Sequence, residues 1–305
     1  MALETILGAG GSVGIPLAKE LTKYTNKIRL VGRKPQKINV EDELVEADLK
    51  DFSKIDSAVA GSAIVYVTIG FEYDINVWRA VWPPFIKAVI DACEKHGAKL
   101  VFFDNMYMYD HTQLANMTEE TPMNPKTKKG VVRKQLVDMI WEAVKAGRIQ
   151  AIIARAADFI GPKNSVFVLS VLGNFKQGKK ADWLITDKVL HNFTFVDDAA
   201  KAVAILAHED DTWNQVWHMP STPAKTGKEW LELAAQIAGV EPKYRLAPKW
   251  LLTIMGWFNP LFREIGEMSY QSATDYYLNS DKFCKRYNFK VTPPEEAVKH
   301  VYSML

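Results

Sequence analysis

The chain has little of what several classes of protein require. Only two of its 305 residues are cysteines, Cys93 and Cys284, and neither belongs to a CxxC motif or to a cluster of cysteine and histidine. This scarcity argues against a disulfide framework and against a bound metal, and it predicts a reducing, cytoplasmic location. Long apolar runs are also missing, so the sequence predicts neither a membrane-spanning segment nor a signal peptide.

An excess of charge of one sign is missing as well. The 38 Lys and Arg residues and the 36 Asp and Glu residues are interspersed, which leaves a formal net charge of +2. No nucleic-acid or membrane partner is therefore predicted. Internal repeats and low-complexity segments are not evident, which argues against solenoid and disordered chains. What remains is an ordinary globular composition, 48% hydrophobic, with a small molecule as the expected partner.

Short apolar runs alternate with longer amphipathic segments through the first half of the chain. The runs are rich in Ile, Val, Leu and Phe and too short for helices, which predicts buried parallel strands at 5–7, 27–31, 63–68, 99–103 and 150–154. Helical periodicity predicts helices at 13–24, 76–95 and 128–146. This alternation is typical of an α/β protein with a Rossmann-type, doubly wound parallel sheet, whose ligand crevice lies at the carboxyl ends of the strands.

A glycine-rich loop follows the first predicted strand and opens the first predicted helix. It reads Gly8-Ala9-Gly10-Gly11-Ser12-Val13-Gly14, in which Gly8, Gly11 and Gly14 have the GxxGxxG spacing. Glycine permits the tight turn, the approach of the backbone to a pyrophosphate and the close packing of helix on strand, while the helix N-terminus attracts phosphate charge. In this context the loop, with Gly8, Gly10, Gly11, Ser12, Val13 and Gly14, predicts a dinucleotide-binding site.

The end of the second predicted strand indicates which dinucleotide binds. A carboxylate there would accept hydrogen bonds from the ribose of NAD and repel a 2′-phosphate, but the sequence has Gly32-Arg33-Lys34. Arg33 offers a planar fork of donors and Lys34 a point charge, so NADP(H) is predicted ahead of NAD(H). The alternative is that both are solvated loop cations. Asp48 either accepts a hydrogen bond from the adenine amino group or caps the next turn.

The second half of the chain is less regular. Strands are predicted at 189–196 and 216–219, and helices at 199–208, 228–238 and 295–304. We expect residues 1–160, joined by 188–218, to form an NADP-binding Rossmann domain, and residues 161–187 and 219–305 to form a smaller C-terminal substrate-binding lobe. Aromatic residues late in the chain either line an apolar substrate pocket or belong to the core: Trp250, Trp257, Phe258, Phe262, Tyr270, Tyr276 and Tyr277.

Together with the glycine loop, three further segments carry a family resemblance: 102–109 (FFDNMYMY), 155–162 (RAADFIGP) and 191–198. Over nearly its whole length the chain resembles the short-chain dehydrogenase/reductase superfamily, in its extended, NAD-dependent epimerase/dehydratase-like branch. The resemblance implies a Rossmann fold, a nicotinamide cofactor and a homodimer that pairs the helix after the fourth strand with the helix carrying the catalytic lysine. Apolar candidates for that surface are Trp78, Trp82, Val89 and Trp141.

The family's chemistry uses a Ser or Thr together with a Tyr four residues before a Lys. By the resemblance, Lys134 takes the place of the Lys and would hold the nicotinamide ribose, while Asn105 takes the place of the Ser and can hydrogen-bond a substrate oxygen. Four residues before Lys134 stands Gly130, so the usual proton donor is missing. This departure resembles the atypical members of the superfamily, which often lack the usual tetrad.

A different side chain must then act as the acid in a carbonyl reduction. Tyr107 and Tyr109 follow the fifth strand, and Tyr107 is the better candidate because the family's residue at position 109 usually packs; alternatively, both only pack. His191 stands where sugar-nucleotide enzymes of the branch often have Arg, and it is either a second donor or structural. Asp158 either orients a donor or serves as a cap.

Two functions from different classes fit these residues. The first is an NADP(H)-dependent oxidoreductase or epimerase-like enzyme acting on the carbonyl or hydroxyl group of a small molecule. The second is a catalytically silent NADP(H)-binding regulatory or sensor protein. The missing tyrosine favours the second function, whereas the substrate lobe with His191 and Gly161-Pro162 favours the first.

Overall fold

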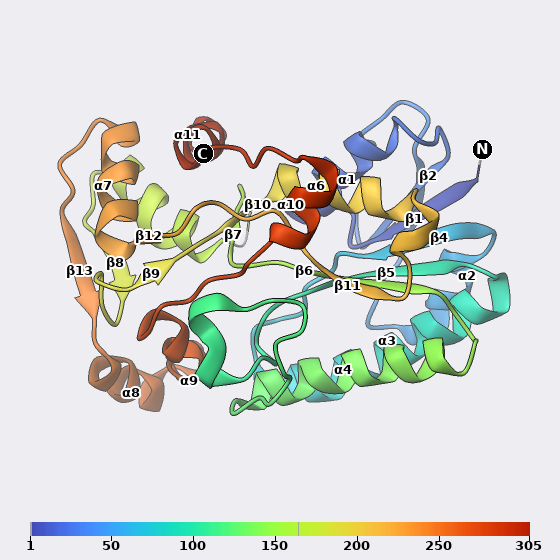
Figure 1. Ribbon diagram of the computed structural model, residues 1–305, viewed down its shortest axis with the longest axis horizontal. Helices are drawn as coiled ribbons and strands as arrows, with labels where there is room; N and C mark the ends of the chain where they lie inside the picture. The colour runs from blue at the N-terminus through green and yellow to red at the C-terminus, as the bar shows by residue number, and fades with distance from the viewer. Residues whose placement is uncertain (1, 164) are drawn as a thin grey trace.

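A seven-stranded, wholly parallel sheet forms the centre of the computed structural model, which describes residues 2–163 and 165–305 (Figure 1). The strand order is β11-β6-β5-β4-β1-β2-β3, so the chain winds outward from β1 in both directions. The strands are β1 (Leu3–Leu7), β2 (Ile28–Gly32), β3 (Glu43–Glu46), β4 (Ser62–Val67), β5 (Lys99–Asp104), β6 (Ala151–Arg155) and β11 (Gln215–His218). The Rossmann-type α/β class and the predicted early strands are confirmed.

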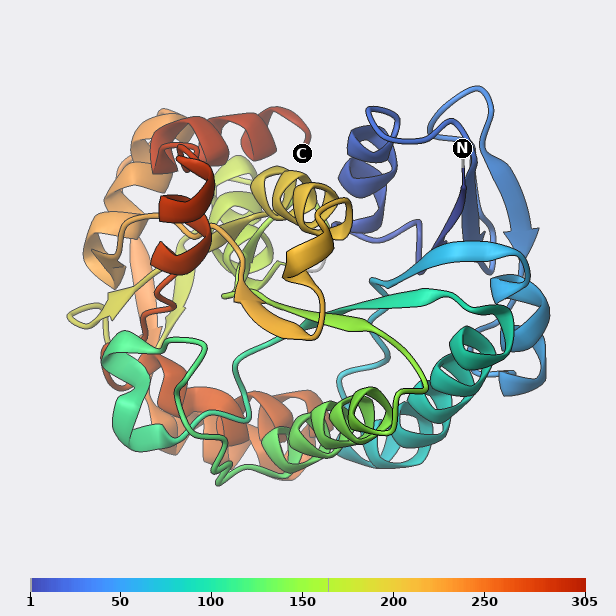
Figure 2. The ribbon, with the colours of Figure 1, turned by 45° about the vertical axis from the view of Figure 1, so that its right-hand side comes forward.

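Helices cover both faces of this sheet. On one face, α1 (Gly14–Leu21) packs beside α6 (Val196–Ala207), and their apolar sides share a core with β1 and β6. On the other face lie α2 (Ile55–Val59), α3 (Ile75–His96) and α4 (Lys128–Lys145) (Figure 2). Since β4 and β6 are apolar on both sides, burial on both faces is what their sequences require.

The remaining elements gather at the end of the molecule away from the N-terminus (Figures 1 and 2). Three two-stranded sheets pair β7 (Phe159–Ile160) with β10 (Thr194–Phe195), β9 (Leu190–His191) with β12 (Lys225–Thr226), and β8 (Ala181–Leu184) with β13 (Tyr244–Ala247). The helices here are α5 (Gly173–Lys176), α7 (Gly227–Ala238), α8 (Lys249–Phe258), α9 (Pro260–Met268) and α11 (Pro294–Ser303), whereas α10 (Asp281–Tyr287) packs on β11 at the edge of the large sheet. A π-helix spans Val168–Leu172, and short 3₁₀ turns span Phe52–Lys54, His111–Asn116, Asp210–Thr212 and Ser269–Ser272.

The strand predicted at 189–196 is two short strands instead. Asn192 lies between β9 and β10, fully buried, and its side-chain amide exchanges two hydrogen bonds with the backbone of Leu278: Nδ2 donates to the carbonyl (2.9 Å) and Oδ1 accepts from the N–H (3.0 Å). A buried side-chain amide must find such partners. The segment therefore turns to meet the C-terminal part of the chain rather than continuing as one strand.

Two expectations about aromatic residues are wrong. Trp78, Trp82 and Val89 are 6%, 3% and 0% exposed, because they pack in the chain's own core and are not available to a dimer surface; Trp141 is half-buried. Conversely, Trp250, Trp257 and Phe258 are 65%, 77% and 85% exposed, so for them both alternatives are wrong, whereas Tyr276 is fully buried and belongs to the core as the second alternative states. Helical spacing identified an apolar face in each segment but not what covers it.

A buried cluster of charges at the end of β5 ties three elements together. The Asp104 carboxylate accepts hydrogen bonds from Arg133 Nε (2.8 Å) on α4 and from Arg155 Nε (3.1 Å) on β6. All three side chains are nearly inaccessible to solvent. Arg133 also donates to the Phe103 carbonyl (3.0 Å) and lies over the ring of Phe102 (4.7 Å from the centroid). The first residues of α4 are thereby held against the carboxyl end of β5.

Replacing Asp104 by Ala leaves two buried guanidinium groups without their carboxylate. We expect the free energy of unfolding to fall by about 3–5 kcal/mol. Asp138→Ala is the control, because the Asp138 carboxylate is 43% exposed and pairs with Lys134 on the helix surface, which makes a loss below about 1 kcal/mol the expectation. Urea denaturation measures both, and equal losses would contradict the structural role of Asp104.

Candidate active site

The glycine loop joins β1 to α1 through a backbone that needs glycine at two positions. Gly8 has φ +99°, and a Cβ there would lie 2.7 Å from the backbone nitrogen of Ile69. A Cβ at Gly14 would lie 2.8 Å from the Cα and the carbonyl oxygen of Ala9. The loop is closed by a hydrogen bond from the Gly11 N–H to the Gly8 carbonyl (3.1 Å). Tight turning and close packing of helix on strand explain these glycines.

A different set of glycines leaves the carboxyl edge of the sheet open. No described atom lies within 4 Å of the place a Cβ would occupy at Gly10, at Gly32 at the end of β2, or at Gly70 beyond β4. Val13 is buried as the residue that precedes α1. The open backbone meets the N-terminus of α1, which is the arrangement that accepts a pyrophosphate. The residues present therefore fit a dinucleotide across the ends of β1, β2 and β4.

A lysine from the second half of the chain lies over the glycine loop. The Lys163 N–H donates to Ser12 Oγ (3.2 Å), Ser12 Oγ donates to the Lys163 carbonyl, and Lys163 Nζ donates to the Gly10 carbonyl (3.2 Å). Gly161 permits this approach, because a Cβ there would lie 2.7 Å from Val196 Cγ1 and 3.5 Å from Ser12 Cβ. Sequence reasoning recorded Gly161-Pro162 only as a family motif and missed Lys163.

The residues predicted to select the dinucleotide lie at the rim of this edge. Arg33 and Lys34 follow β2 and are exposed. Asp48 is also exposed, and its Oδ1 accepts a hydrogen bond from the Lys50 N–H (3.0 Å), which forms a local turn. These positions leave the guanidinium and the carboxylate accessible to a ligand that extends across β2 and β3.

The loop after β5 holds two tyrosines in different surroundings. Asn105 Oδ1 accepts a hydrogen bond from the Tyr107 N–H (3.1 Å), which shapes the turn. The partly buried ring of Tyr107 stacks on Trp78, with centroids 6.3 Å apart. Tyr109 is fully buried, hydrogen-bonded to His218 and covered by Arg155 at 4.6 Å from the ring centroid. Tyr109 therefore packs, whereas the Tyr107 ring keeps part of its surface exposed.

Tyr107 belongs to a cluster of tyrosines around Asp158. Its pKa is raised well above the ordinary tyrosine value, first because the hydroxyl is desolvated and next because Tyr73 and Asp158 would repel a phenolate. Burial likewise raises the pKa of Tyr73, Tyr270 and Tyr276, and Asp158 adds to the shift in each case. Tyr270 Oη is buried and accepts or donates no hydrogen bond among the described residues, while its neighbour Tyr276 Oη accepts from Gln271 Nε2.

His191 and Asp158 lie side by side. His191 Nε2 is 3.2 Å from Asp158 Oδ2, and the imidazole stacks on Tyr276 with centroids 5.3 Å apart. The His191 side chain is 8% exposed, whereas that of Asp158 is 41% exposed. The Asp158 carboxylate is thus open to solvent and lies against the buried histidine, which places two of the predicted residues in one group.

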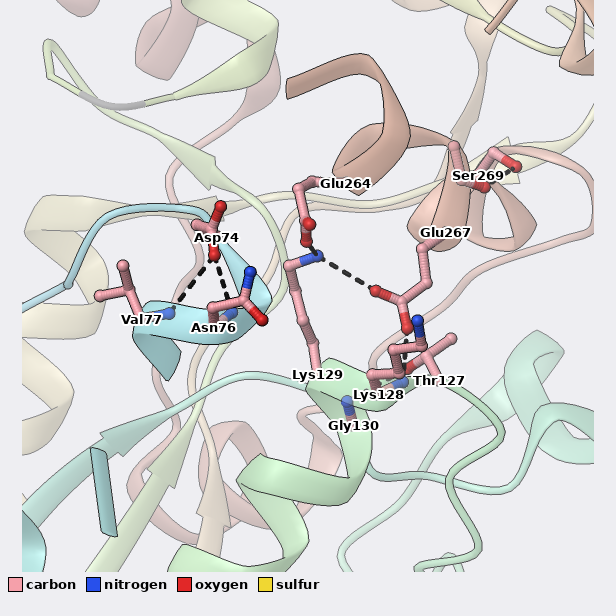
Figure 3. A network of polar contacts seen from close by, with 11 residues as sticks. Asp74, Asn76, Val77, Thr127, Lys128, Lys129, Gly130, Glu264, Glu267 and Ser269 are labelled. Carbon is pink, nitrogen blue, oxygen red and sulfur yellow. Dashed lines mark hydrogen bonds and ion pairs between the residues drawn. The ribbon is translucent and has the colours of Figure 1, made fainter. Parts of the chain in front are cut away.

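A lysine that sequence reasoning did not select anchors the start of α4. Lys129 is fully buried, and its Nζ pairs with Glu264 and with Glu267 (3.2 Å), both on α9, while lying 4.5 Å from the ring centroid of Tyr73 (Figure 3). Glu267 also accepts from the Lys128 N–H. Asp74, the N-cap of α3, lies beside this group in Figure 3 and accepts from the Asn76 N–H (2.7 Å). These ion pairs join α9 to the start of α4.

Lys134 and Gly130 have other surroundings. Lys134 Nζ lies 2.7 Å from Asp138 Oδ2, and its side chain is 37% exposed. The Gly130 N–H donates to Thr127 Oγ1 (3.1 Å), and a Cβ at Gly130 would meet the Tyr107 carbonyl and lie 2.8 Å from Pro125 Cβ. The glycine is thus explained by the close approach of α4 to the Tyr107 loop, because a side chain at this position has no room.

The position of Lys129 on α4 already indicates that this lysine is buried. Lys129 and Arg133 occupy the same buried side of α4 as Val132, Leu136, Val137 and Ile140. A cation at such a position needs a buried partner. The glutamates that supply it for Lys129 come from α9, more than 130 residues later, so the sequence shows the demand without showing its partner.

Among residues 2–163 and 165–305, no group of three His, Cys, Asp or Glu side chains is placed to hold a metal ion. None of the described helices is both long and apolar enough to cross a bilayer.

A glycine loop at the switch point of a wound parallel sheet defines a Rossmann-type dinucleotide-binding fold. The model of the NAD dependent epimerase/dehydratase family matches residues 5–217, and the chain belongs to that family. No curated protein sequence matches the chain significantly.

Solved structures of other proteins share the fold at low identity. The match to UDP-glucose 4-epimerase from Thermus thermophilus, solved with NAD, covers 99% of this chain and 99% of that one, at 13% identity and a TM-score of 0.78. For dTDP-glucose 4,6-dehydratase from Bacillus anthracis, also with NAD, coverage is 99% and 96%, identity 13% and TM-score 0.79. A monomeric L-threonine 3-dehydrogenase from a metagenome gives 99% and 98%, 15% and 0.76.

A side chain at position 130 should cost stability. Gly130→Ala places a methyl group against the Tyr107 carbonyl and Pro125, so we expect the free energy of unfolding to fall by roughly 1–3 kcal/mol. Gly266→Ala tests the alternative that any helical glycine behaves this way: it lies inside α9, and the one atom near its Cβ position among the described residues is Leu252 Cβ at 3.9 Å, so no loss is expected. Thermal unfolding compares the two variants. If Gly130→Ala were neutral, the close approach of α4 to the loop would not be the reason for the glycine.

Proposed function

We propose that the protein is an NADP(H)-dependent oxidoreductase or epimerase-like enzyme that acts on a carbonyl or hydroxyl group of a small molecule. The observation that carries this proposal is the Tyr270 hydroxyl, which is buried near Tyr107, Tyr276 and Asp158 and makes no hydrogen bond of good geometry among the described residues. A buried polar atom of this kind normally has a partner. A substrate oxygen bound near Asp158 would be such a partner for the Tyr270 hydroxyl.

Tyr107 is the proposed proton donor. Its raised pKa keeps the hydroxyl protonated at neutral pH, which suits hydrogen-bond donation to a carbonyl oxygen as charge develops there. The same shift makes Tyr107 a poor base for removing a proton from an alcohol. His191, oriented by Asp158, is the second candidate donor.

The charged side chains around Asp158 indicate which class of substrate the site favours. Asp158 is 41% exposed and Glu267 is 21% exposed, whereas the nearby cation Lys129 is buried and already paired with glutamates. A diphosphate brought to this group would meet two carboxylates, and the exposed Lys128 beside Glu267 offsets only part of their charge. The arrangement supports an uncharged carbonyl compound over a sugar nucleotide.

The cofactor site is proposed from the open glycines and the exposed cations. NADP(H), when bound, supplies the hydride. The backbone at Gly10 and the start of α1 would bind its pyrophosphate, and Arg33 with Lys34 would bind the 2′-phosphate. Asp48 would accept from the adenine amino group. Lys134 would have to leave Asp138 to reach a ribose.

Arg33→Ala should weaken NADPH binding by about 10- to 100-fold, because one charge-assisted hydrogen-bonded pair is lost, and should leave NADH within a few fold. Isothermal titration measures both. Lys134→Ala serves as the matched comparison: a ribose contact predicts equal weakening of the two dinucleotides. Equal affinities of the wild type for NADPH and NADH, or preference retained in Arg33→Ala, would contradict the proposed role of Arg33.

Tyr107→Phe removes one hydroxyl and keeps the ring on Trp78. With a carbonyl substrate found by NADPH oxidation across a panel, we expect turnover to fall on the order of a hundredfold and NADPH affinity to stay within a few fold. Tyr24→Phe, in the segment that follows α1, is the control. Unchanged turnover in Tyr107→Phe would move the acid role to His191. Tight NADPH binding without turnover of any substrate would instead favour the silent sensor.

A further inference from the structure

An exposed apolar face lies on the hairpin of α8 and α9. Its residues are Trp250, Ile254, Trp257 and Phe258 on α8 and Leu261 on α9, which are 65%, 42%, 77%, 85% and 50% exposed. The four positions on α8 follow i, i+4, i+7 and i+8 spacing, so they form one stripe. Contiguous exposed apolar patches of this kind mark interaction sites.

The hairpin does not need this face for its own folding. Its other side is packed: Leu252 is 2% exposed, and a Cβ at Gly256 would lie 3.1 Å from the backbone of Arg263. Glu264 on α9 is buried in its ion pair with Lys129. The two helices are thus closed against each other and anchored to α4, and the stripe faces outward as a surplus apolar surface.

Charge around the face has one sign. The segment 242–263 contains four basic residues and no acidic residue: Lys243, Arg245, Lys249 and Arg263. Lys243 and Arg245 pair with Glu241 (2.9 Å) and Asp182 (2.7 Å), whereas Lys249 and Arg263 form no ion pair with any described residue. The cations that flank the stripe are therefore available to an anionic partner.

We propose that the face formed by Trp250, Ile254, Trp257, Phe258 and Leu261 docks on the surface of a bilayer that contains anionic lipid. Trp and Phe are the side chains that insert at the boundary between headgroups and acyl chains, and Lys and Arg beside them attract anionic headgroups. The protein then lies on the bilayer and does not cross it.

Charge argues against a second copy of the chain as the occupant. In an isologous contact the same patch meets itself, and since segment 242–263 contains no acidic residue, that segment of one copy offers Lys249 and Arg263 of the other only cations. Like charges brought together in this way oppose association. An anionic lipid surface satisfies the apolar stripe and the flanking cations at once.

Sedimentation with lipid vesicles tests the proposal on the full chain. We expect the wild type to sediment with phosphatidylcholine vesicles containing roughly a third phosphatidylglycerol, less with pure phosphatidylcholine, and progressively less as salt is raised. Trp257→Glu/Phe258→Glu should lower partitioning by roughly tenfold or more, because two apolar anchors become charged. Lys249→Glu/Arg263→Glu should abolish the preference for anionic vesicles.

Val40→Glu/Val131→Glu is the matched control, since it adds the same charge at exposed apolar positions elsewhere, 81% and 55% accessible. It should bind vesicles as the wild type does. Circular dichroism and NADPH titration on every variant separate loss of docking from loss of folding. The proposal is overturned if the wild type ignores both vesicle types, if the control loses binding equally, or if velocity sedimentation shows a self-association that Trp257→Glu/Phe258→Glu abolishes without any vesicle binding.

Discussion

The carboxylate of Asp104 is the contact on which the site depends. It ends β5, receives Arg133 from α4 and Arg155 from β6, and so fixes how the first turn of α4 lies against the loop that carries Asn105 and Tyr107. With α4 held this close to the Tyr107 loop, a side chain at position 130 has no room, and Lys129 at the start of the helix is buried. A buried charge that is fully paired gives direction to a helix in a way that apolar packing alone does not.

Local patterns predicted the sheet well because each central strand is buried on both faces and bounded by turns. The runs at 63–68, 99–103 and 150–154 match β4, β5 and β6 within a residue, and the glycine loop lies where its spacing requires. Prediction failed where the conformation of a residue depends on a partner far away in the sequence. Asn192 interrupts the strand predicted at 189–196 because its amide meets Leu278, and the exposure of Trp257 depends on helices that the periodicity cannot arrange.

The candidate site shows the same division between local and distant causes. Strand ends and family motifs predicted Asn105, Tyr107, Asp158 and His191 as site residues. Asp158 contacts His191 and lies near enough to Tyr107 to raise its pKa. Tyr73, Lys129 and Glu264 were not selected, because each becomes informative only beside the others. Their partners are separated by a large part of the chain, and a single sequence without its fold gives no distance between them.

The strand order also imposes a schedule on synthesis. β6 ends at Arg155, but the strand that covers its free edge, β11, begins at Gln215, about 60 residues later. At about 5–20 residues per second, an apolar strand of sequence AIIAR waits for several seconds with an unpaired edge after leaving the ribosome. During that interval the unpaired edge of β6 is exposed to pairing with another chain.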